Sequence, residues 1–348
     1  MKNVIFQKRL ELVHRPTKIS KLTNLSKTLG TEISIWRDDL TGFVESGNKI
    51  RKLEFLLADA IDKGCNTIIT CGGIQSNHTR TTTVAARKFG MEVVVLVSHP
   101  DGEKILNSPT SGNLLLNRIF GAKFKFIDPQ ELKSAGSFDP FLELEATKLS
   151  REGRKPYIIP LGGSNPIGCL GYLTAIEEML DLWKQCEPSS SGPDSIFCAV
   201  GSGATHAGLV LGLREFNHPR TSVYGISSGE SKTHFENTIR VLLSNTAKQF
   251  SVKLENVDVE RVTVFDDYIG EGYGVATDSE LKFYIDFARS EGILLDPCYT
   301  GKAFNGMISE LKKNPGRYGK KILFLHSGGV FANFAYERQC HGLLSNYV

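Results

Sequence analysis

Apolar residues follow two different periods along the chain. Short runs of β-branched and aliphatic residues, such as EVVVLVS at 92–98, are typical of strands buried on both faces of a parallel sheet. Between them lie longer segments in which apolar residues return every three or four positions, as in amphipathic helices. Strands are predicted at 32–36, 67–71, 92–98, 123–127, 157–161, 195–200, 222–227, 262–265 and 321–326. Helices are predicted at 19–29, 50–63, 77–89, 113–120, 138–152, 168–185, 207–216, 232–249, 278–291 and 301–313.

This alternation predicts an α/β fold with mostly parallel strands, arranged in two domains. The regular rhythm from about 50 to 160 indicates a small domain of residues 51–159. Residues 1–50 are expected to pack with the carboxy-terminal half, so that 1–50 and 160–348 together form a large domain. The stretch PSSSGPD at 188–194 is predicted to be a surface loop.

Composition narrows the class of protein. The 348 residues include 41 basic and 38 acidic side chains, a net charge of +3 that gives no particular attraction for nucleic acid or acidic membranes. No apolar run approaches the roughly 18–20 residues of a membrane span, and the amino terminus lacks the apolar core of a secretory signal. Seven scattered cysteines without a C-x-x-C pair argue against a disulfide framework and a thiolate metal site. We expect a cytoplasmic protein without a metal; the basic first ten residues leave an organelle transit segment as the alternative.

Lys49 is the residue best suited to covalent chemistry. It follows a Gly-Asn pair in ESGNKIRKLEFL (45–56), where a loop meets the start of an amphipathic helix. A lysine that forms a Schiff base must lose its proton near neutral pH, which requires partial burial beside cationic or apolar neighbours. Arg51, Lys52 and the apolar helix behind them supply such neighbours. The alternative is a solvated lysine at a helix cap.

Two further loops follow apolar strands and open helices. In FCAVGSGATH (197–206), two glycines and the hydroxyls of Ser202 and Thr205 meet a helix amino terminus, which favours a bound anion. The spacing is neither the dinucleotide nor the Walker pattern, so a small monophosphate fits better than a nucleotide; a plain tight turn would need the same glycines. In TCGGIQSNHTR (70–80), Ser76, Asn77 and His78 open a helix and suit a substrate carboxylate, although helix capping alone would explain Ser76 or Asn77.

Hydroxyl-bearing residues also end apolar segments near the carboxy terminus. Tyr299 and Thr300 lie in DPCYTGKAF (296–304), and Ser327 lies in ILFLHSGGVFAN (322–333). Such strand ends are where ligands bind in open α/β sheets. Tyr273 in EGYGVAT (271–277) is a further candidate, or a half-buried structural residue. One lysine and two anion-binding loops suit a cofactor with a reactive carbonyl and a phosphate, and that cofactor is pyridoxal 5′-phosphate.

With these residues in view, the chain resembles the fold-type II pyridoxal-phosphate enzymes. The similar branch contains 1-aminocyclopropane-1-carboxylate (ACC) deaminase, D-cysteine desulfhydrase and L-cysteate sulfo-lyase. The resemblance runs from about residue 12 to residue 334 and rests on RDDLTG, GNKIRKLEFL, GGIQSNHTR, VGSGATHAGL and DPCYTGKAF in this order. It implies the fold of the tryptophan synthase β subunit, with two three-layer α/β domains, an active site in the cleft between them, and a homodimer.

The resemblance also implies roles for individual residues. Lys49 would bind the cofactor aldehyde covalently, and Asn77 would contact the 3′-oxygen of the ring. The phosphate would be bound by Lys52, Gly201, Ser202, Gly203, Ala204 and Thr205. The substrate carboxylate would be held by Ser76, Asn77 and His78, with Tyr273 and Tyr299 lining the substrate side. Catalysis would therefore rest on Lys49, Ser76, Tyr273 and Tyr299.

Two positions bear on the substrate. In ACC deaminases a glutamate follows the tyrosine that matches Tyr299, and a leucine follows the histidine that matches His326; here those places hold Thr300 and Ser327. Hydroxyls at both resemble the D-cysteine desulfhydrases, and either one could face the pyridine nitrogen of the cofactor. The favoured interpretation is α,β-elimination from D-cysteine, a small amino-acid substrate, to give sulfide, ammonia and pyruvate. The alternatives are ACC deamination, elimination from D-serine, β-chloro-D-alanine or L-cysteate, and a non-catalytic cofactor-binding homologue.

Overall fold

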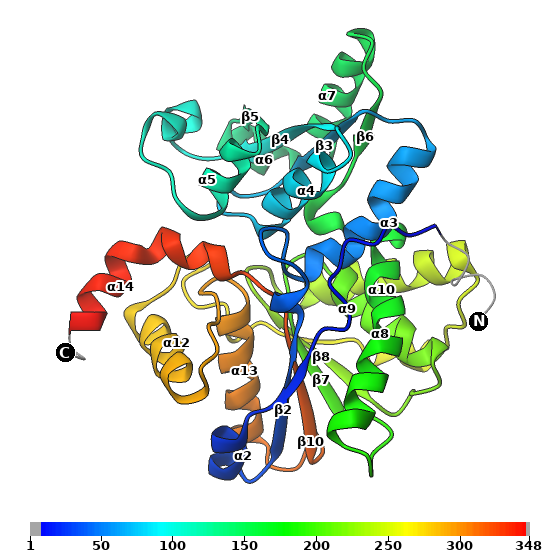
Figure 1. Ribbon diagram of the computed structural model, residues 1–348, viewed down its shortest axis with the longest axis vertical. Coiled ribbons are helices and arrows are strands. Elements are labelled where there is room, and N and C mark those ends of the chain that lie inside the picture. Colours follow the sequence, from blue (N-terminus) through cyan, green and yellow to red (C-terminus); the bar gives the residue numbers. More distant parts are fainter. Residues whose placement is uncertain (1–7, 346–348) are drawn as a thin grey trace.

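A computed structural model describes residues 8–345, in which the strands form two sheets. The larger sheet has the order β1 (Ile19–Lys21), β2 (Glu32–Arg37), β10 (Lys321–His326), β7 (Ser195–Val200), β8 (Ser222–Ser227) and β9 (Thr263–Phe265). The smaller sheet has the order β5 (Lys123–Ile127), β4 (Glu92–Ser98), β3 (Thr67–Cys71) and β6 (Pro156–Ile158). All pairings are parallel except that of β1 with β2, and the sheets lie one above the other in Figure 1. The α/β class with mostly parallel strands is therefore confirmed.

The amino-terminal segment joins the larger sheet. Strand β2 pairs in parallel with β10, with Ile33 opposite Ile322, so this segment lies beside a strand of the carboxy-terminal half. The predicted helix at 19–29 is wrong in its first part, because Ile19–Lys21 forms an edge strand and only α2 (Thr23–Leu29) is helical. Ile19 and Leu22 are buried, whereas no residue of α2 is; the apolar spacing reflects a strand and a turn covering the core rather than one helix face. Residues 1–7, most of the segment considered for organelle transit, lie outside the described part.

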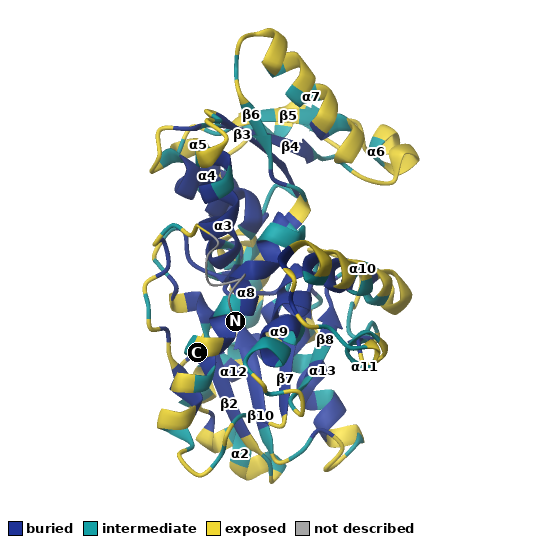
Figure 2. Ribbon diagram, turned by 90° about the vertical axis from the view of Figure 1, so that its right-hand side faces the viewer, coloured by how far each residue is buried: buried dark blue, intermediate teal, exposed yellow. Residues whose placement is uncertain are grey.

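Helices cover both faces of each sheet, because the central strands are apolar on both sides. Along β10, Leu323 and Leu325 pack with α8 (Pro166–Cys186), α9 (Ala204–Glu215) and α10 (Lys232–Phe250), whereas Ile322 and Phe324 pack with α12 (Asp278–Glu291) and α13 (Thr300–Lys313). The smaller sheet packs α3 (Asn48–Asp62) and α4 (Asn77–Arg87) on one face and α7 (Asp139–Arg151) on the other. Figure 2 shows the contrast between buried α3 and α4 and the largely exposed α6 (Pro129–Ala135) and α7. All four strands of the smaller sheet fall within 51–159, and those of the larger sheet fall outside it.

The remaining helices are short or peripheral. They are α5 (Gly112–Ile119), α11 (Asn256–Glu260) and α14 (Glu337–Leu344), with 3-10 turns η1 (Asp38–Leu40), η2 (Gly102–Asn107), η3 (Leu161–Gly163) and η4 (Val330–Tyr336). The predicted strand at 157–161 is shorter than expected, because the chain turns into η3 where two glycines adopt positive φ angles. Residues 188–194 form an irregular connection, as predicted.

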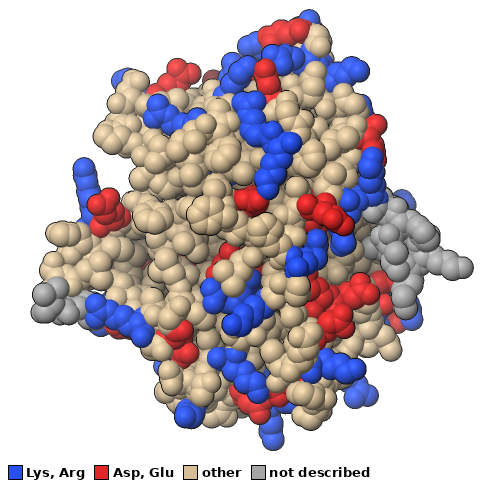
Figure 3. Space-filling model, in the orientation of Figure 1, with Lys and Arg blue, Asp and Glu red and all other residues tan. Residues whose placement is uncertain are grey.

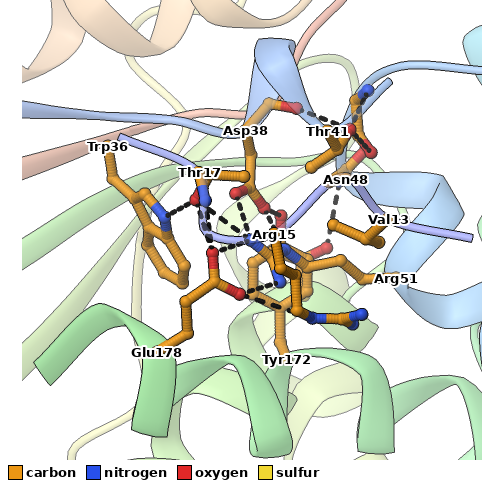
Figure 4. A network of polar contacts seen from close by, with 12 residues as sticks. Val13, Arg15, Thr17, Trp36, Asp38, Thr41, Asn48, Arg51, Tyr172 and Glu178 are labelled. Atoms are coloured by element: carbon orange, nitrogen blue, oxygen red, sulfur yellow. Dashed lines mark hydrogen bonds and ion pairs between the residues drawn. The ribbon is translucent and has the colours of Figure 1, made fainter. Parts of the chain in front are cut away.

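Two features fix the position of α3. Helix α8 crosses it at Gly171, where a Cβ atom would stand 2.6 Å from the carbonyl carbon of Arg51. Beside this crossing a buried polar network surrounds Arg51, whose guanidinium is bonded to Asp38 and Glu178 (Figure 4). Tyr172 from α8 donates to the same Asp38 carboxylate at 2.5 Å. The start of α3 is thus fixed against both α8 and η1, the turn that follows β2.

The surface carries both signs of charge. On the face drawn in Figure 3, basic and acidic side chains are intermixed and no broad area of a single sign is present. Within residues 8–345 there is no helix with the length and apolarity that crossing a membrane requires. In the same part of the chain no group of three or more His, Cys, Asp or Glu side chains is placed to hold a metal ion, and the seven cysteines are unpaired.

Candidate active site

A pocket lies where four helices of the described chain begin. Its wall is formed by Asn48, Lys49, Asn77, His78, residues 199–203, Thr205, His206, Tyr299, Ser327 and Gly328. These residues belong to the first turns of α3, α4 and α9, the residue before α13, and the loops after β7 and β10. None of the four helices carries an acidic residue in its first turn. Their free N–H groups and dipoles therefore make the pocket favourable for anions.

Lys49 is placed at this pocket by the tight turn before α3. Gly47 has a φ of +108°, and a Cβ atom there would stand 2.9 Å from the carbonyl oxygen of Ser327, so only glycine lets these two loops meet. The Nζ atom of Lys49 donates a hydrogen bond of 3.1 Å to Oδ1 of Asn48. Burial lowers the pKa of Lys49 to about 8, with Asp296 opposing this shift and Arg80 adding to it. The amine is therefore much easier to deprotonate than an exposed lysine.

The loop before α9 has the form of an anion-binding turn. Gly203, the residue before the helix, has a φ of +92° and offers no side chain to cap the helix. At Gly201 a Cβ atom would stand 2.9 Å from the ring of Tyr299, so the loop must be free of a side chain there. The Oγ1 atom of Thr205 accepts a hydrogen bond of 3.1 Å from the amide of Asn48. Asn48 thereby joins the Lys49 turn to this loop, a connection that the sequence did not reveal.

Lys52 lies behind the pocket wall rather than in it. It is buried, and its Nζ donates to the carbonyl oxygen of Gly162 at 3.1 Å. Burial, together with the charge of Lys49, holds the pKa of Lys52 well below its ordinary value. The η3 turn that Lys52 holds is followed by Ser164, whose hydroxyl donates to that of Ser202 at 2.7 Å. Lys52 therefore supports the loop before α9 through the η3 turn, and Ser164 is a contact that sequence reasoning missed.

The start of α4 brings Asn77 and His78 to the pocket. Ser76 caps the helix, its Oγ accepting from the N–H of Thr79 at 3.3 Å. The ring of His78 points into the interior, where Nε2 lies 2.8 Å from the hydroxyl of Thr70. Burial, Lys49 and Lys52 hold the pKa of His78 well below its ordinary value, so the ring is neutral. The expectation that His78 holds a carboxylate can therefore apply only to its backbone N–H.

Tyr299 and Tyr273 meet across the open side of the pocket. Their hydroxyl oxygens are 2.5 Å apart, and burial raises the pKa of both phenols. Tyr299 belongs to the wall, whereas Tyr273 lies on a glycine-rich loop outside it. Lys302, which is buried in α13, donates to the carbonyl oxygens of Ile269 and Gly272 on this loop. Lys302 thereby ties the Tyr273 loop to the helix that follows Tyr299.

Thr300 and Ser327, the two hydroxyls left open by the sequence, are placed differently. Ser327 belongs to the pocket wall. Thr300 does not: its hydroxyl donates to Oδ1 of Asp296 at 2.7 Å and accepts from the Asp296 N–H at 2.8 Å. Asp296 also accepts from the N–H groups of Cys298 and Tyr299 and so caps the start of α13. The Thr300 hydroxyl is thus hydrogen-bonded to Asp296 both as donor and as acceptor, and of the two hydroxyl residues only Ser327 lines the pocket.

Comparisons with known proteins agree with this geometry. Residues 10–328 match the family described as "Pyridoxal-phosphate dependent enzyme". A protein of Thermotoga maritima, provisionally named 1-aminocyclopropane-1-carboxylate deaminase, is 38% identical over 332 residues, which cover 95% of this chain and 99% of that protein. The crystal structure of a protein described as an ACC deaminase homologue has a TM-score of 0.84 and 36% identity and covers 99% of both chains.

More distant structures share the fold alone. One is a hydrogen sulfide-producing enzyme from Fusobacterium nucleatum, with a TM-score of 0.60 and 16% identity over 94% of this chain and 98% of that one. The family match and the two nearer relatives each span almost the whole chain. This chain therefore belongs to the pyridoxal-phosphate-dependent enzymes of fold type II, in the family of ACC deaminase homologues.

Proposed function

We propose that this enzyme converts D-cysteine and water into hydrogen sulfide, ammonia and pyruvate by α,β-elimination. The observation that carries the proposal is that Ser327 belongs to the pocket wall. Among the described residues that line the pocket there is no aspartate or glutamate. The ring nitrogen of the cofactor would then meet a hydroxyl rather than a carboxylate.

The residues at the pocket fit pyridoxal 5′-phosphate. Lys49 offers a buried amine of lowered pKa for the aldehyde, and the turn at Gly203 offers backbone N–H groups for the phosphate. Gly201 and Gly203 let this loop approach the Tyr299 ring and helix α10 closely, because Cβ atoms there would stand 2.9 and 3.0 Å from their side chains. When bound, the cofactor withdraws electrons from the α-carbon of an amino acid attached to it. Asn77 would face its ring oxygen and Ser327 its ring nitrogen.

Different residues of the chain would then bind the substrate, take its α-proton and donate to the leaving group. The start of α4, with the Ser76 hydroxyl and the N–H groups of Asn77 and His78, would hold the substrate carboxylate. The Nζ atom of Lys49 would take the α-proton as general base and hold it beside the Asn48 amide oxygen. Tyr273 and Tyr299 are phenols, which keep their protons near neutral pH, so they can donate toward the departing sulfur.

The hydroxyl at position 327 separates this reaction from ACC deamination. A carboxylate beside the ring nitrogen favours its protonated form and a stronger withdrawal of electrons, whereas a serine hydroxyl does not. Thiolate is already a good leaving group, so weaker withdrawal is adequate for its elimination. ACC has no hydrogen on its α-carbon, and its ring opening must begin differently and calls for the stronger withdrawal.

ACC deamination to 2-oxobutanoate and ammonia is the second candidate, favoured by the names of the two nearer relatives. Replacing Ser327 by Leu should leave turnover of ACC little changed if this candidate is correct. It should strongly reduce sulfide release if D-cysteine is the substrate.

The deciding experiment is a parallel assay of D-cysteine, L-cysteine, ACC and D-serine, with sulfide and 2-oxoacids both measured. Sulfide and pyruvate in equal amounts from D-cysteine support the proposal. Release of 2-oxobutanoate from ACC without sulfide from D-cysteine would overturn it. Lys49→Ala should abolish the visible absorption of the bound cofactor and all turnover. Lys63→Ala, at the exposed end of the same helix, is the matched control and should retain both.

We also propose, from the family resemblance, that the enzyme is a cytoplasmic homodimer whose active site lies in a cleft between residues 51–159 and the rest of the chain. Sedimentation of the purified enzyme tests the dimer, since a single species of 38.4 kDa would contradict it.

A further inference from the structure

We propose that Asn113 is a positioning residue that holds the amide of Asn77 so that its NH2 group, and not its carbonyl oxygen, faces the pocket. The inference rests on the proposed role of Asn77 opposite the ring oxygen of the cofactor. Asn113 lies in the first turn of α5, outside the pocket wall, and nothing in the sequence marks it as part of the site.

Three side chains form a continuous hydrogen-bonded relay behind the pocket. Nε of Arg80 donates to Oδ1 of Asn113 at 2.9 Å. Nδ2 of Asn113 donates to Oδ1 of Asn77 at 2.8 Å. Asn77 belongs to the pocket wall, and no residue among 8–345 accepts a hydrogen bond from its Nδ2.

The direction of this relay follows from groups that can act in only one way. A guanidinium can only donate, so the atom of Asn113 that faces Arg80 must be its oxygen. The carbonyl oxygen of Gln75 can only accept, and it lies 2.8 Å from the other end of the Asn113 amide, which must therefore be its nitrogen. That nitrogen then faces Oδ1 of Asn77. The NH2 group of Asn77 is left for the pocket, and the assignment does not depend on telling oxygen from nitrogen by position alone.

The relay is held rigidly and kept from water. Arg80 and Asn113 are both 0% exposed, so no solvent competes for their hydrogen bonds. The remaining N–H groups of Arg80 donate to the carbonyl oxygens of Val44 and Ser46, in the loop that leads to Lys49. The backbone N–H of Asn113 donates to Oε1 of Gln75 at 2.9 Å. Rotating the Asn113 amide would leave buried groups unpaired on both sides, which disfavours the opposite orientation.

A fixed donor at Asn77 has a chemical consequence. A donor facing the ring oxygen stabilises the ionised form of that oxygen, whereas an acceptor in the same place favours the protonated form. The relay would thus determine the ionisation of the bound cofactor, and with it the visible absorption of the holoenzyme.

The test reverses the relay with one isosteric change. In Asn113→Asp the new carboxylate keeps its contact with Arg80 but can no longer donate to Asn77 or to the Gln75 carbonyl oxygen, so the Asn77 amide turns and presents its oxygen to the pocket. The holoenzyme should lose visible absorption in favour of the near ultraviolet. The pH at which the absorption changes should move upward, and pyridoxal 5′-phosphate should bind on the order of ten- to a hundred-fold more weakly.

Asn117→Asp is the matched control. Asn117 lies one turn later on α5, is equally buried, and bonds to Thr79 and Thr83 of α4 and to the backbone carbonyl oxygen of Asn113, but not to Asn77. It should lower thermal stability while leaving the absorption and its pH dependence unchanged. If the two variants remain folded and change the absorption equally, or if neither changes it, the positioning role is wrong.

A double-mutant cycle separates the relay from the added charge. In an Asn77→Ala background, Asn113→Asp should have no further effect on the absorption, because the amide it would turn is gone. An effect that persists there would mean that the carboxylate acts directly through its charge, and would overturn the proposal. Failure of the proposed function is distinguishable, since the absorption reports the bound cofactor whichever amino acid is the substrate.

Discussion

Replacing Arg51 by methionine should destabilise the fold by about 3–5 kcal/mol. Arg51 and Asp38 have side chains that are 0% exposed, and their two hydrogen bonds are both 2.7 Å long. Two more bonds, of 2.9 and 3.2 Å, join the guanidinium to Glu178 (Figure 4). Methionine fills much of the volume of the arginine stem but supplies no charge, so the variant tests the ion pair rather than packing.

The expected magnitude follows from what the variant leaves behind. Asp38 would keep the hydroxyl of Tyr172 as its side-chain donor, which cannot neutralise a buried carboxylate. Glu178 would keep the N–H and hydroxyl of Thr17, so its loss is smaller. The cost therefore falls mainly on Asp38, and uncompensated buried charges of this kind are the ones that cost several kcal/mol.

Urea denaturation at pH 7 measures this cost as the shift in midpoint multiplied by the common slope. The free energy of unfolding of Arg51→Lys should lie between those of the parent and of Arg51→Met, because lysine keeps the charge but not the planar fork that bonds both carboxylates. Lys282→Met is the control, since it breaks an exposed ion pair with Asp286 and should cost under about 1 kcal/mol. A cost for Arg51→Met within about 1 kcal/mol of that control would refute the reasoning.

The same variant has a pH signature. Burial acts to raise the pKa of Glu178, but Arg51 and the two hydrogen bonds from Thr17 together outweigh it, so the folded pKa lies below the ordinary value. A group with a depressed folded pKa contributes stability above its unfolded pKa, and this contribution is lost as the pH falls through the folded pKa. The difference in free energy of unfolding between the parent and Arg51→Met should therefore become smaller below about pH 4. A gap that stays constant down to pH 3 would contradict a charge-based origin.

Three further changes test other parts of the site. Lys302→Met should lower kcat/KM about ten-fold or more while the cofactor absorption persists, because the Tyr273 loop loses the hydrogen bonds from Lys302 to the carbonyl oxygens of Ile269 and Gly272. Unchanged kcat/KM would contradict this. Gly203→Ala should weaken binding of pyridoxal 5′-phosphate, since φ is +92° and the new Cβ would stand 3.0 Å from a neighbouring side chain. Gly316→Ala is the control: φ there is +80° but the new Cβ would lie in open space, so binding should be unchanged. The rate at which the apoprotein binds the cofactor should increase up to about pH 8 and level off above it, because the pKa of Lys49 is about 8 and only the neutral amine reacts. A rate that still rises at pH 10 would contradict the lowered pKa.

The central strands could be predicted to the residue, and the edges could not. The runs at Glu92–Ser98 and Thr67–Cys71 match the prediction because strands buried on both faces are continuously apolar and leave little ambiguity. Strand β1 could not be predicted, because a strand of three residues is too short to show a periodic pattern of apolar and polar positions. The order of strands, with β10 between β2 and β7, depends on pairings that no local pattern contains.

At the site, the backbone features could be predicted and the side-chain directions could not. Glycine turns at the ends of apolar strands are visible in the sequence, because the need for a positive φ or a close approach selects the residue type. The ring of His78 turns inward because Thr70 offers a hydroxyl on the strand beneath it. The Thr300 hydroxyl is not available to the pocket because it donates a hydrogen bond to Asp296. Asn113 was overlooked because polar residues on a helix usually face solvent, and only the packing of α5 on α4 buries it.

Arg80 joins the two properties on which the proposed chemistry depends. It begins the relay that turns Asn77 toward the pocket, and its charge helps burial to lower the pKa of Lys49. These effects have different physical ranges, because the relay needs hydrogen-bond contact whereas the charge acts through space. A neutral side chain at position 80 should therefore alter both the cofactor absorption and the pH of cofactor capture, while Asn113→Asp, which keeps Arg80 in place, should alter mainly the absorption. The orientation of the Asn77 amide and the pKa of Lys49 can thus be changed separately, although Arg80 contributes to both.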